Sequence, residues 1–506
     1  MLKSKYNGGL KLDNPYPVNE IDLIRIPLPD KVVLPMQQRI GNQAIPIVSV
    51  GERVLTGQII ATIDDQRCAP VHASISGTVV AIDEHVYAHK SGLKGLCVTI
   101  ESDGKDEWVD TSIGCTERYE TCTANTIYNK IRVSGIVGMG GAGFPTHTKV
   151  RLAEGCHTLI VNATECEPGI TCDAALMEAY PTKVIRGIEV LLHICKAERA
   201  IIAIEDDKQD AIAALKKFCN NENISIEVMP TKYTSGAEKL LLKYLLGIEV
   251  PTGKFASDVG VLCQNVGTVV AMFDAVVENR PLISRAVTVA GSAVKESKNL
   301  QVRLGASYDY LLSFVDMKEG SHKISMNGLM MGIELDSTNY SVSKNTNCVF
   351  IDQLEESKPT KECIRCGLCN TVCPVDLLPQ QLYWYSKSKN IDKAVEYNLL
   401  DCIECNCCSY VCPSQIPLVN YYQYSKALYK QQVKEKQQTE SARERFEFRE
   451  LRLERNKRER AEMMEAKKIA LKEKMAKDKA QKVLIEAALE RVNTAKSAQG
   501  SQEDDG

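Results

Sequence analysis

The hydrophobic and polar positions follow three different patterns along the chain. Up to about residue 105, apolar residues come in short runs separated by Gly and Pro, such as Lys31–Leu34 and Gly77–Ile82, which predicts a small all-β domain. Between residues 158 and 229, short apolar runs alternate with stretches at helical spacing. That order predicts a parallel sheet covered by helices. Residues 431–496 are rich in Lys, Arg, Glu, Gln and Ala and contain no Pro or Gly, which predicts one long solvated helix.

Length and charge narrow the possible classes of protein. A chain of 506 residues is too long for a single core, so we expect at least about three domains. The 62 basic and 65 acidic residues nearly balance, which gives no electrostatic case for a nucleic-acid partner. The first residues contain no apolar signal-peptide core, and no apolar stretch reaches the ~18 residues of a membrane-spanning helix. We therefore expect no signal peptide and no transmembrane segment, so that any membrane attachment is through partners.

Two cysteine runs carry the strongest chemical signal. Each has the spacing C-x2-C-x2-C-x3-C-P, which places three thiolates around one 4Fe-4S cluster and directs the fourth to a second cluster. The predicted ligands of one cluster are Cys363, Cys366, Cys369 and Cys412, and those of the other are Cys373, Cys402, Cys405 and Cys408. A pair of zinc sites is the alternative, although zinc has no use for two interlocked runs. Thiolate ligands and free cysteines among the 20 in the chain indicate a reducing compartment.

A second candidate site begins with a glycine-rich loop. Residues 134–146 include Gly138, Gly140, Gly141 and Gly143, and Lys149 follows shortly after. Such a loop exposes backbone amides to a phosphate or a flavin, although by itself it is also compatible with a simple turn. The apolar run Thr158–Val161 then leads to Asn162, Glu165 and Glu167. Polar side chains at the end of a strand beside a glycine loop favour a nucleotide site over a solvated loop.

These motifs resemble a known flavoprotein family. Gly-x-Gly-Gly-Ala-Gly-Phe-Pro-Thr followed by Asn-Ala-x-Glu-x-Glu-Pro is similar to the FMN and NADH site of the flavoprotein subunit of respiratory complex I and its relatives. Residues 233–239 and Gln264–Thr268 resemble two further segments of that family. The resemblance implies no catalytic base or nucleophile. It implies FMN or NADH contacts from Gly138, Gly140, Gly141, Gly143, Lys149, Asn162, Glu165, Glu167, Asn265 and Thr268.

The order of the parts predicts a multidomain α/β protein. Val50–Ile63 and Ala69–Ile82 resemble the barrel-sandwich hybrid of lipoyl and biotin carriers, but residues 64–68 contain no lysine to carry a cofactor. We therefore expect that module to be structural. The expected order is a barrel-sandwich hybrid β domain at 1–105, an FMN/NADH-binding α/β domain at 106–284, a soluble-ligand-binding β-grasp domain at 285–350, a two-cluster ferredoxin-like domain at 351–430, and a charged helical extension with a disordered tail at 431–506.

This order of domains resembles the C subunits of the Rnf (Rsx) electron-transport complex. The resemblance implies a peripheral subunit on the cytoplasmic face of the bacterial inner membrane. There it would move electrons between NADH and the membrane subunits through FMN and two 4Fe-4S clusters, coupled to ion translocation, with ferredoxin or a redox regulator as acceptor. Met139 replaces the Arg of complex I relatives, and Gly169 replaces the Tyr of many Rnf relatives. The alternatives are an electron-wiring adaptor with a degenerate flavin fold and the flavoprotein subunit of a soluble dehydrogenase or hydrogenase.

Overall fold

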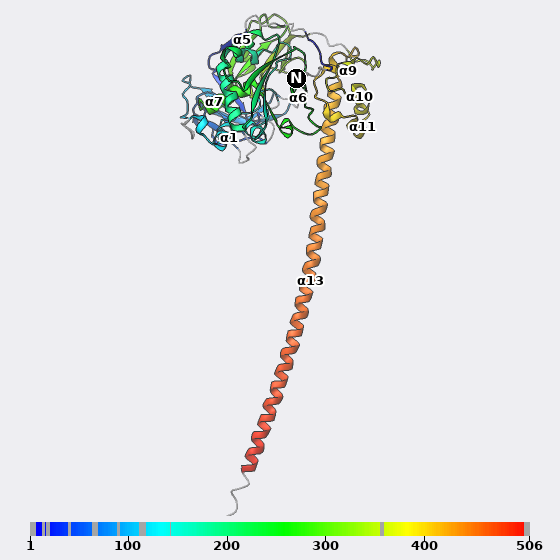
Figure 1. Cartoon of the computed structure of the whole chain (residues 1–506). Helices are drawn as coiled ribbons and strands as arrows, with labels where there is room; N and C mark the ends of the chain where they lie inside the picture. The colour runs from blue at the N-terminus through cyan, green and yellow to red at the C-terminus, as the bar shows by residue number, and fades with distance from the viewer. Residues whose placement is uncertain are drawn as a thin grey trace, which may run out of the picture. The chain divides into compact units, whose positions relative to one another are not determined.

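The structure is a computed structural model of the whole chain, shown in Figure 1. It describes residues 7–12, 16, 21–38, 42–62, 69–88, 92–110, 118–141, 143–354 and 359–499. The chain divides into two compact units, Met1–Lys426 and Ala427–Gly506. The first unit contains all the sheets and both candidate sites.

The N-terminal region forms two antiparallel sheets. Their strands are β2 (Lys31–Pro35), β3 (Ile45–Pro46), β4 (Arg53–Val54), β5 (Ile59–Thr62), β6 (Val71–His72), β7 (Gly77–Val86) and β8 (Lys94–Ser102). One sheet has the order β2-β8-β7-β4 and the other β3-β5-β6. Val32, Leu34 and Ile60 are fully buried between them, because alternate side chains of each strand face the core. The all-β prediction is confirmed, whereas the hairpin tip at residues 64–68 lies outside the described residues.

A parallel sheet in the order β11-β10-β9-β12 forms the centre of the next region, as the alternating pattern predicts. The strands are β9 (Thr158–Ala163), β10 (Arg199–Glu205), β11 (Ile224–Met229) and β12 (Val261–Asn265). The residues of β9, β10 and β12 are mostly buried, as in parallel sheets covered on both faces, whereas the edge strand β11 is partly exposed. The surrounding helices are η1 (Tyr119–Thr121), α1 (Ala124–Val133), α2 (Thr146–Leu152), α3 (Cys172–Ala179), α4 (Pro181–Cys195), α5 (Gln209–Phe218), α6 (Glu238–Leu246), η2 (Ala256–Val259) and α7 (Val266–Val276).

A six-stranded mixed sheet follows in the order β1-β14-β13-β17-β15-β16. Its elements are β13 (Ser284–Ala290), β14 (Lys298–Arg303), α8 (Tyr308–Leu312), β15 (His322–Met326), β16 (Ile333–Leu335) and β17 (Cys348–Gln353). Its first strand, β1 (Leu23–Arg25), comes from the N-terminal region and pairs in parallel with β14. The β-grasp assignment and the domain boundaries stay predictions.

The cysteine module is built from two similar turns. Its helices are α9 (Leu368–Thr371), α10 (Pro379–Lys387), α11 (Ile391–Glu396), η3 (Leu399–Asp401) and α12 (Cys407–Tyr410). Arg365 and Gly367 in the first cysteine run have positive φ, as do Glu404 and Asn406 at the equivalent positions of the second. Both runs therefore adopt the same backbone turn, which directs the intervening thiols to one side.

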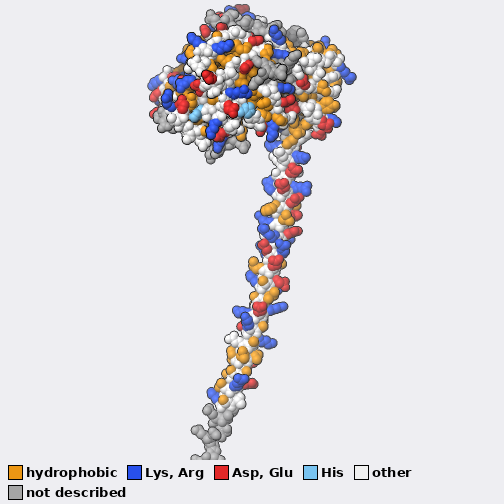
Figure 2. All heavy atoms as spheres, in the orientation of Figure 1, with side chains coloured by type: hydrophobic (Ala, Val, Ile, Leu, Met, Phe, Trp, Pro, Cys, Tyr) orange, Lys and Arg blue, Asp and Glu red, His pale blue; other side chains and the backbone are white. Residues whose placement is uncertain are grey.

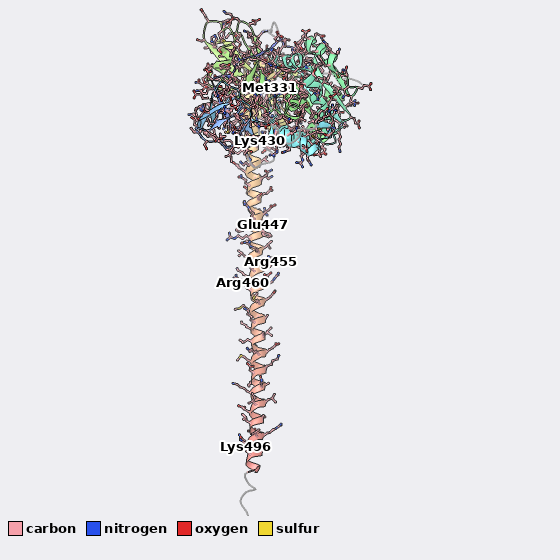
Figure 3. All side chains as sticks on the ribbon, turned by 90° about the vertical axis from the view of Figure 1, so that its left-hand side faces the viewer. Met331, Lys430, Glu447, Arg455, Arg460 and Lys496 are labelled. Carbon is pink, nitrogen blue, oxygen red and sulfur yellow. The ribbon has the colours of Figure 1, made fainter. Side chains whose placement is uncertain are left out.

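The last helix, α13, extends over 82 residues from Leu418 to Gln499, a length of about 120 Å. It begins earlier than its charged stretch predicts, because Leu418, Val419 and Tyr422 are buried in the cysteine module. Beyond them, basic and acidic side chains are interspersed along the helix (Figures 2 and 3), with ion pairs such as Arg443–Glu447 at 2.7 Å. Within the described residues, no helix is long and apolar enough to cross a membrane. The acidic end of the tail lies outside the described residues.

Candidate functional site

Four segments far apart in the sequence meet at the carboxyl ends of β9 and β12. The Met139 N–H in the glycine loop donates to Thr268 Oγ1 at 2.9 Å. At the end of β9, Asn162 Nδ2 donates to the Gly236 carbonyl at 2.8 Å. Asn162 and Asn265 are paired in register on adjacent strands. This edge of a parallel sheet is where nucleotides bind in open α/β folds.

The glycine loop closes on itself before α2. The Gly138 N–H donates to the Phe144 carbonyl at 2.8 Å, and Gly141 has a φ of +105°, which favours glycine. At Gly140, a Cβ atom would lie 3.2 Å from the Cβ of Asn265, so a larger residue would press on the neighbouring turn. Gly140 and Gly141 are exposed and therefore present backbone at this edge of the sheet.

Asn265 connects the loop region to two helices. As the N-cap of α7, its Oδ1 accepts from the N–H groups of Gly267 at 2.9 Å and Thr268 at 3.3 Å. Its Nδ2 donates to Asp173 Oδ2 at 2.6 Å, and burial raises the pKa of Asp173. These bonds hold the Asn265 amide in one orientation beside the glycine loop.

Lys149 places a cation near the same edge. Its Nζ lies 2.7 Å from Glu238 Oε2, with about a third of each side chain exposed (30% and 36%). An ammonium group has three donors, so the pair with Glu238 leaves Lys149 able to contact a phosphate as well. Glu238 begins α6, directly after the segment that contains Gly236.

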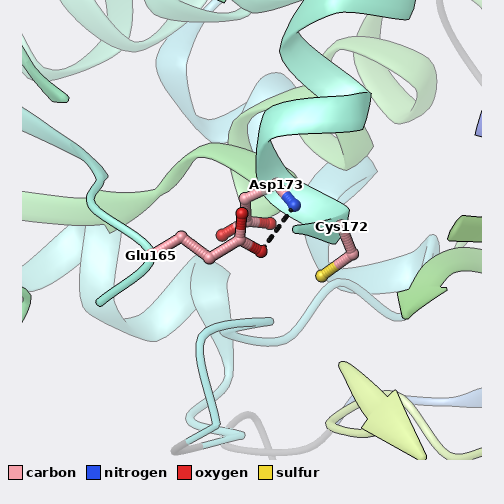
Figure 4. A group of neighbouring side chains, drawn as sticks. All are labelled: Glu165, Cys172 and Asp173. Atoms are coloured by element: carbon pink, nitrogen blue, oxygen red, sulfur yellow. Dashed lines mark hydrogen bonds between the residues drawn. The ribbon is translucent and has the colours of Figure 1, made fainter. Parts of the chain in front are cut away.

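Glu165 is buried and faces α3 (Figure 4). Its two carboxyl oxygens accept from the N–H groups of Asp173 at 2.9 Å and Ala174 at 3.2 Å. Burial, and then the nearby charge of Asp173, raise the pKa of Glu165 to about 8. The Cys172 thiol completes a group whose potential ligand atoms lie within 4.8 Å of one another. Because the Glu165 oxygens already bind the first turn of α3, this group needs no metal to explain it.

Glu167 points toward the loop between β15 and β16. Its Oε1 accepts from the Met330 N–H, and a Cβ atom at Gly328 would overlap the Glu167 side chain. Burial raises the pKa of Glu167 to about 7. Both glutamates therefore have protein partners, and a contact of either with NADH stays a prediction.

The sequence did not identify two residues of this region as candidates. Asp173 follows the motif on a separate helix, and Arg285 belongs to β13. Arg285 is 3% exposed, and it donates to the carbonyl groups of Lys344 and, at 3.5 Å, Met139. Together with Gly267, these two residues and Met139 line part of a cavity of about 720 Å³. A charged residue at the start of an apolar strand was the available signal for Arg285, but nothing local links it to the glycine loop.

The eight motif cysteines line two separate pockets. Four line an outer pocket, namely Cys363, Cys366, Cys369 and Cys412. The other four line an inner pocket, namely Cys373, Cys402, Cys405 and Cys408. In each set, three cysteines come from one run and the fourth from the other. Four thiols around one pocket fit the ligand requirement of a 4Fe-4S cluster. Cys407 is buried beside Cys405 and lines the inner pocket as well.

Family models match three parts of the chain. The RnfC barrel sandwich hybrid domain matches residues 4–105. The Nuo51 FMN-binding domain matches residues 131–274, which include the glycine loop and β9 to β12. The 4Fe-4S dicluster domain matches residues 362–416, which include both cysteine pockets.

Curated relatives share much of the sequence. The C subunit of the ion-translocating oxidoreductase complex from Serratia proteamaculans is 43% identical over 387 residues, which are 75% of this chain and 55% of the relative. The protein of the same name from Pseudomonas aeruginosa is 42% identical over 463 residues, 90% of this chain and 60% of the relative. The chain thus spans little more than half the length of these relatives.

Among solved structures, an NAD+-reducing [NiFe]-hydrogenase in the H2-reduced state aligns over 56% of this chain and 54% of its own, with 17% identity and a TM-score of 0.41. That likeness is too low to support an argument. The sequence relatives and the family models agree with each other and with the order of the observed sheets and pockets. Over three quarters or more of its length, the chain is similar to the C subunits of ion-translocating oxidoreductase complexes.

Proposed function

We propose that this chain is the electron-transfer subunit of a membrane-bound ion-translocating oxidoreductase, in which it moves electrons between NADH and membrane partners. The observation that carries the proposal is that one compact unit contains two kinds of site. One is the carboxyl-end edge of a parallel sheet, where nucleotides bind in such folds, and the other is a pair of four-cysteine pockets. The edge brings together the glycine loop, Asn162, Asn265 and Thr268. A flavin site joined to clusters is the combination needed to convert two-electron into one-electron chemistry.

The residues at the edge of the parallel sheet fit FMN. The amides of the glycine loop, including Gly138, Gly140, Gly141 and Gly143, would bind the phosphate side, and Lys149 would offset its charge. Asn162, Asn265 and Thr268 would orient the ring or the ribityl group. FMN, when bound, accepts a hydride and releases electrons singly. The chain's own contribution is to position the flavin and to exclude competing reactions.

The cysteine pockets fit two 4Fe-4S clusters, one in each pocket. NADH would approach the flavin from the side of Glu165 and Glu167, whose carboxyl groups are held by backbone N–H groups. The relatives' names place them in ion-translocating complexes. By analogy, we propose attachment as a peripheral subunit to membrane partners on the cytoplasmic face, with ferredoxin or a redox regulator as the terminal partner.

Anaerobic reconstitution of the full chain with iron, sulfide and FMN tests the proposal. We expect about one FMN and about eight iron atoms per chain, with NADH bleaching the flavin. A chain that takes up iron but retains no FMN would contradict the flavin site. The alternative function, an electron-wiring adaptor with a degenerate flavin fold, would then be favoured. Zinc in place of iron after purification without added metals would contradict the cluster assignment.

A further inference from the structure

The cysteine module is joined to the preceding domains next to the inner pocket. The Tyr233 hydroxyl donates to the Cys405 carbonyl at 2.8 Å. Thr252 Oγ1 donates to Asp401 Oδ2 at 2.8 Å, one residue before Cys402. On the N-terminal segment, the Gly9 N–H donates to the Val372 carbonyl at 2.9 Å, one residue before Cys373. All three bonds are therefore beside ligands predicted for the same cluster.

The two pockets also differ in exposure. Cys373, Cys405 and Cys408 of the inner pocket are buried, whereas Cys366 of the outer pocket is exposed. Beside Cys366, the side chain of Ile364 is 67% exposed. Within the described residues, the inner pocket thus faces the flavin-site domain and the outer pocket has an open rim.

Tyr233 begins the short segment 233–236. The other end of this segment, Gly236, lies at the carboxyl ends of β9 and β12, the proposed FMN site that we call the flavin edge. The backbone of Tyr233 pairs with Leu10, and its ring packs in a buried cluster with Met330, Cys405 and Cys407. Three residues later, the Gly236 carbonyl accepts the Asn162 amide. Three residues span at most about 11 Å between Cα atoms. Residues 233–236 therefore connect the flavin edge to the inner pocket over a short path.

We propose that Tyr233 is a positioning residue that holds the inner pocket against the flavin edge, so that the inner cluster accepts electrons first and the outer cluster passes them on. This inference rests on the proposed function. In each step one electron leaves the reduced flavin and one arrives at the inner cluster, and another single transfer oxidises the inner cluster and reduces the outer. NADH supplies the electron pair. The tyrosine keeps its O–H proton throughout and is not itself oxidised.

The substitution Tyr233→Phe removes the bond to Cys405 and keeps the ring in the buried cluster. In the reconstituted full chain, a light pulse with EDTA as electron donor reduces the flavin, and cluster reduction is followed by absorbance and by electron paramagnetic resonance. We expect unchanged iron content, a shifted resonance signal of one cluster, and cluster reduction slowed several-fold, because the inner pocket is held less tightly against the flavin-site domain.

Tyr128→Phe is the matched control. Tyr128 is also a buried tyrosine of the same domain whose hydroxyl donates to a backbone carbonyl, that of Ile194 at 3.4 Å, but it lies in the core on α1. We expect its cluster-reduction rate to stay within about twofold of the wild type. Equal rates in the wild type and Tyr233→Phe would overturn the role of Tyr233. Because light replaces NADH, a chain reduced by light but not by NADH would instead contradict the proposed NADH activity alone.

A pair of cysteine variants tests the order of the clusters independently. Cys405→Ser and Cys366→Ser change the second cysteine of each run, one in each pocket. In Cys366→Ser, flavin reduction by light should still reduce the remaining inner cluster. In Cys405→Ser, the remaining outer cluster should stay oxidised after the light pulse, although dithionite reduces it. The opposite pattern, or rapid reduction of the outer cluster in Cys405→Ser, would overturn the order.

Discussion

Glu165 shows how one carboxyl group can serve the fold at the edge of a candidate site. Its pKa is raised to about 8, mainly by burial, whereas an unfolded glutamate titrates near 4.5. Between these values the folded chain holds a proton that the unfolded chain has lost, so this group's contribution to stability falls as pH rises. Below about pH 4.5 the contribution is fully present.

The variant Glu165→Gln should therefore flatten the dependence of stability on pH. Across the window from about pH 4.5 to 8, the wild type should lose up to about 1.4 kcal/mol per pH unit relative to the variant. Thermal unfolding midpoints measured at several pH values test this. The exposed Glu198→Gln change is the control and should leave the profile as in the wild type. A parallel profile for Glu165→Gln would show that Glu165 titrates normally in the folded chain.

Lys149 should affect FMN binding more than stability, because its ammonium is partly exposed and already paired with Glu238. We expect Lys149→Met to weaken FMN binding by roughly tenfold or more, the cost of one charge-assisted hydrogen bond, with a smaller loss at high salt. Fluorescence titration of the FMN-free chain measures this. Lys243→Met removes a comparable surface pair with Glu249 and serves as the control. Equal FMN affinity in both variants would exclude a phosphate contact from Lys149.

For single residues, the sequence identified which side chains lie near the edge of the parallel sheet. It did not predict the direction in which each side chain points. The resemblance predicted that Asn162 and Asn265 contact the same cofactor, and the structure pairs them on adjacent parallel strands that end at a common edge. The direction of Glu165 depends on how the short connection to α3 turns back on it, and that of Glu167 depends on the loop before β16, which is far away in the sequence. Arg285 was missed for the same reason, since its contact with Met139 spans two domains.

Among the elements, α7 links helix stability to the flavin edge. Asn265→Ala removes the N-cap bonds to Gly267 and Thr268 and should cost about 1 kcal/mol of stability. Because the same side chain orients the turn beside the glycine loop, FMN retention should fall as well. Denaturation by urea and the flavin content after gel filtration measure the two effects.

Ser307→Ala is the matched control for α7. Ser307 caps α8 through the Tyr310 N–H at 3.2 Å, in the mixed sheet region. It should lose a similar amount of stability and keep its flavin. If Asn265→Ala keeps its flavin too, the residue acts only as a helix cap.

The regular elements were the predictable part of the fold. Burial on both faces explains why β9 and β10 read as continuous apolar runs, and the charged repeat explains the helix beyond residue 430. The pairing of β1 with β14 was not predictable, because three residues at the edge of a sheet carry no local signal for a partner some hundreds of positions away. The contact of Tyr233 with Cys405 is equally non-local.

At the scale of the whole molecule, the two compact units should differ in their importance for the cofactors. The early turns of α13 are buried in the cysteine module, and Lys426 donates to Glu404 at 2.9 Å. After residue 433, the described side chains of α13 are exposed.

A chain ending at residue 436 should therefore keep its clusters, its FMN and its unfolding midpoint, with stability changed by no more than about 0.5 kcal/mol. Scanning calorimetry and iron content measure this. A chain ending at residue 417, before α13, is the contrasting variant and should lose iron, because Tyr422 and Lys426 are removed from the module. Loss of the cofactors in the longer variant would show that the second unit supports the first.

The central claim is that one chain conducts electrons from NADH through a flavin to its clusters. The most direct measurement is stopped-flow mixing of the anaerobically reconstituted chain with NADH, recording flavin and cluster absorbance together. We predict bleaching of the flavin followed by bleaching of the clusters, with no other protein present. Clusters that are present and reducible by dithionite, beside a flavin that NADH leaves oxidised, would contradict the account.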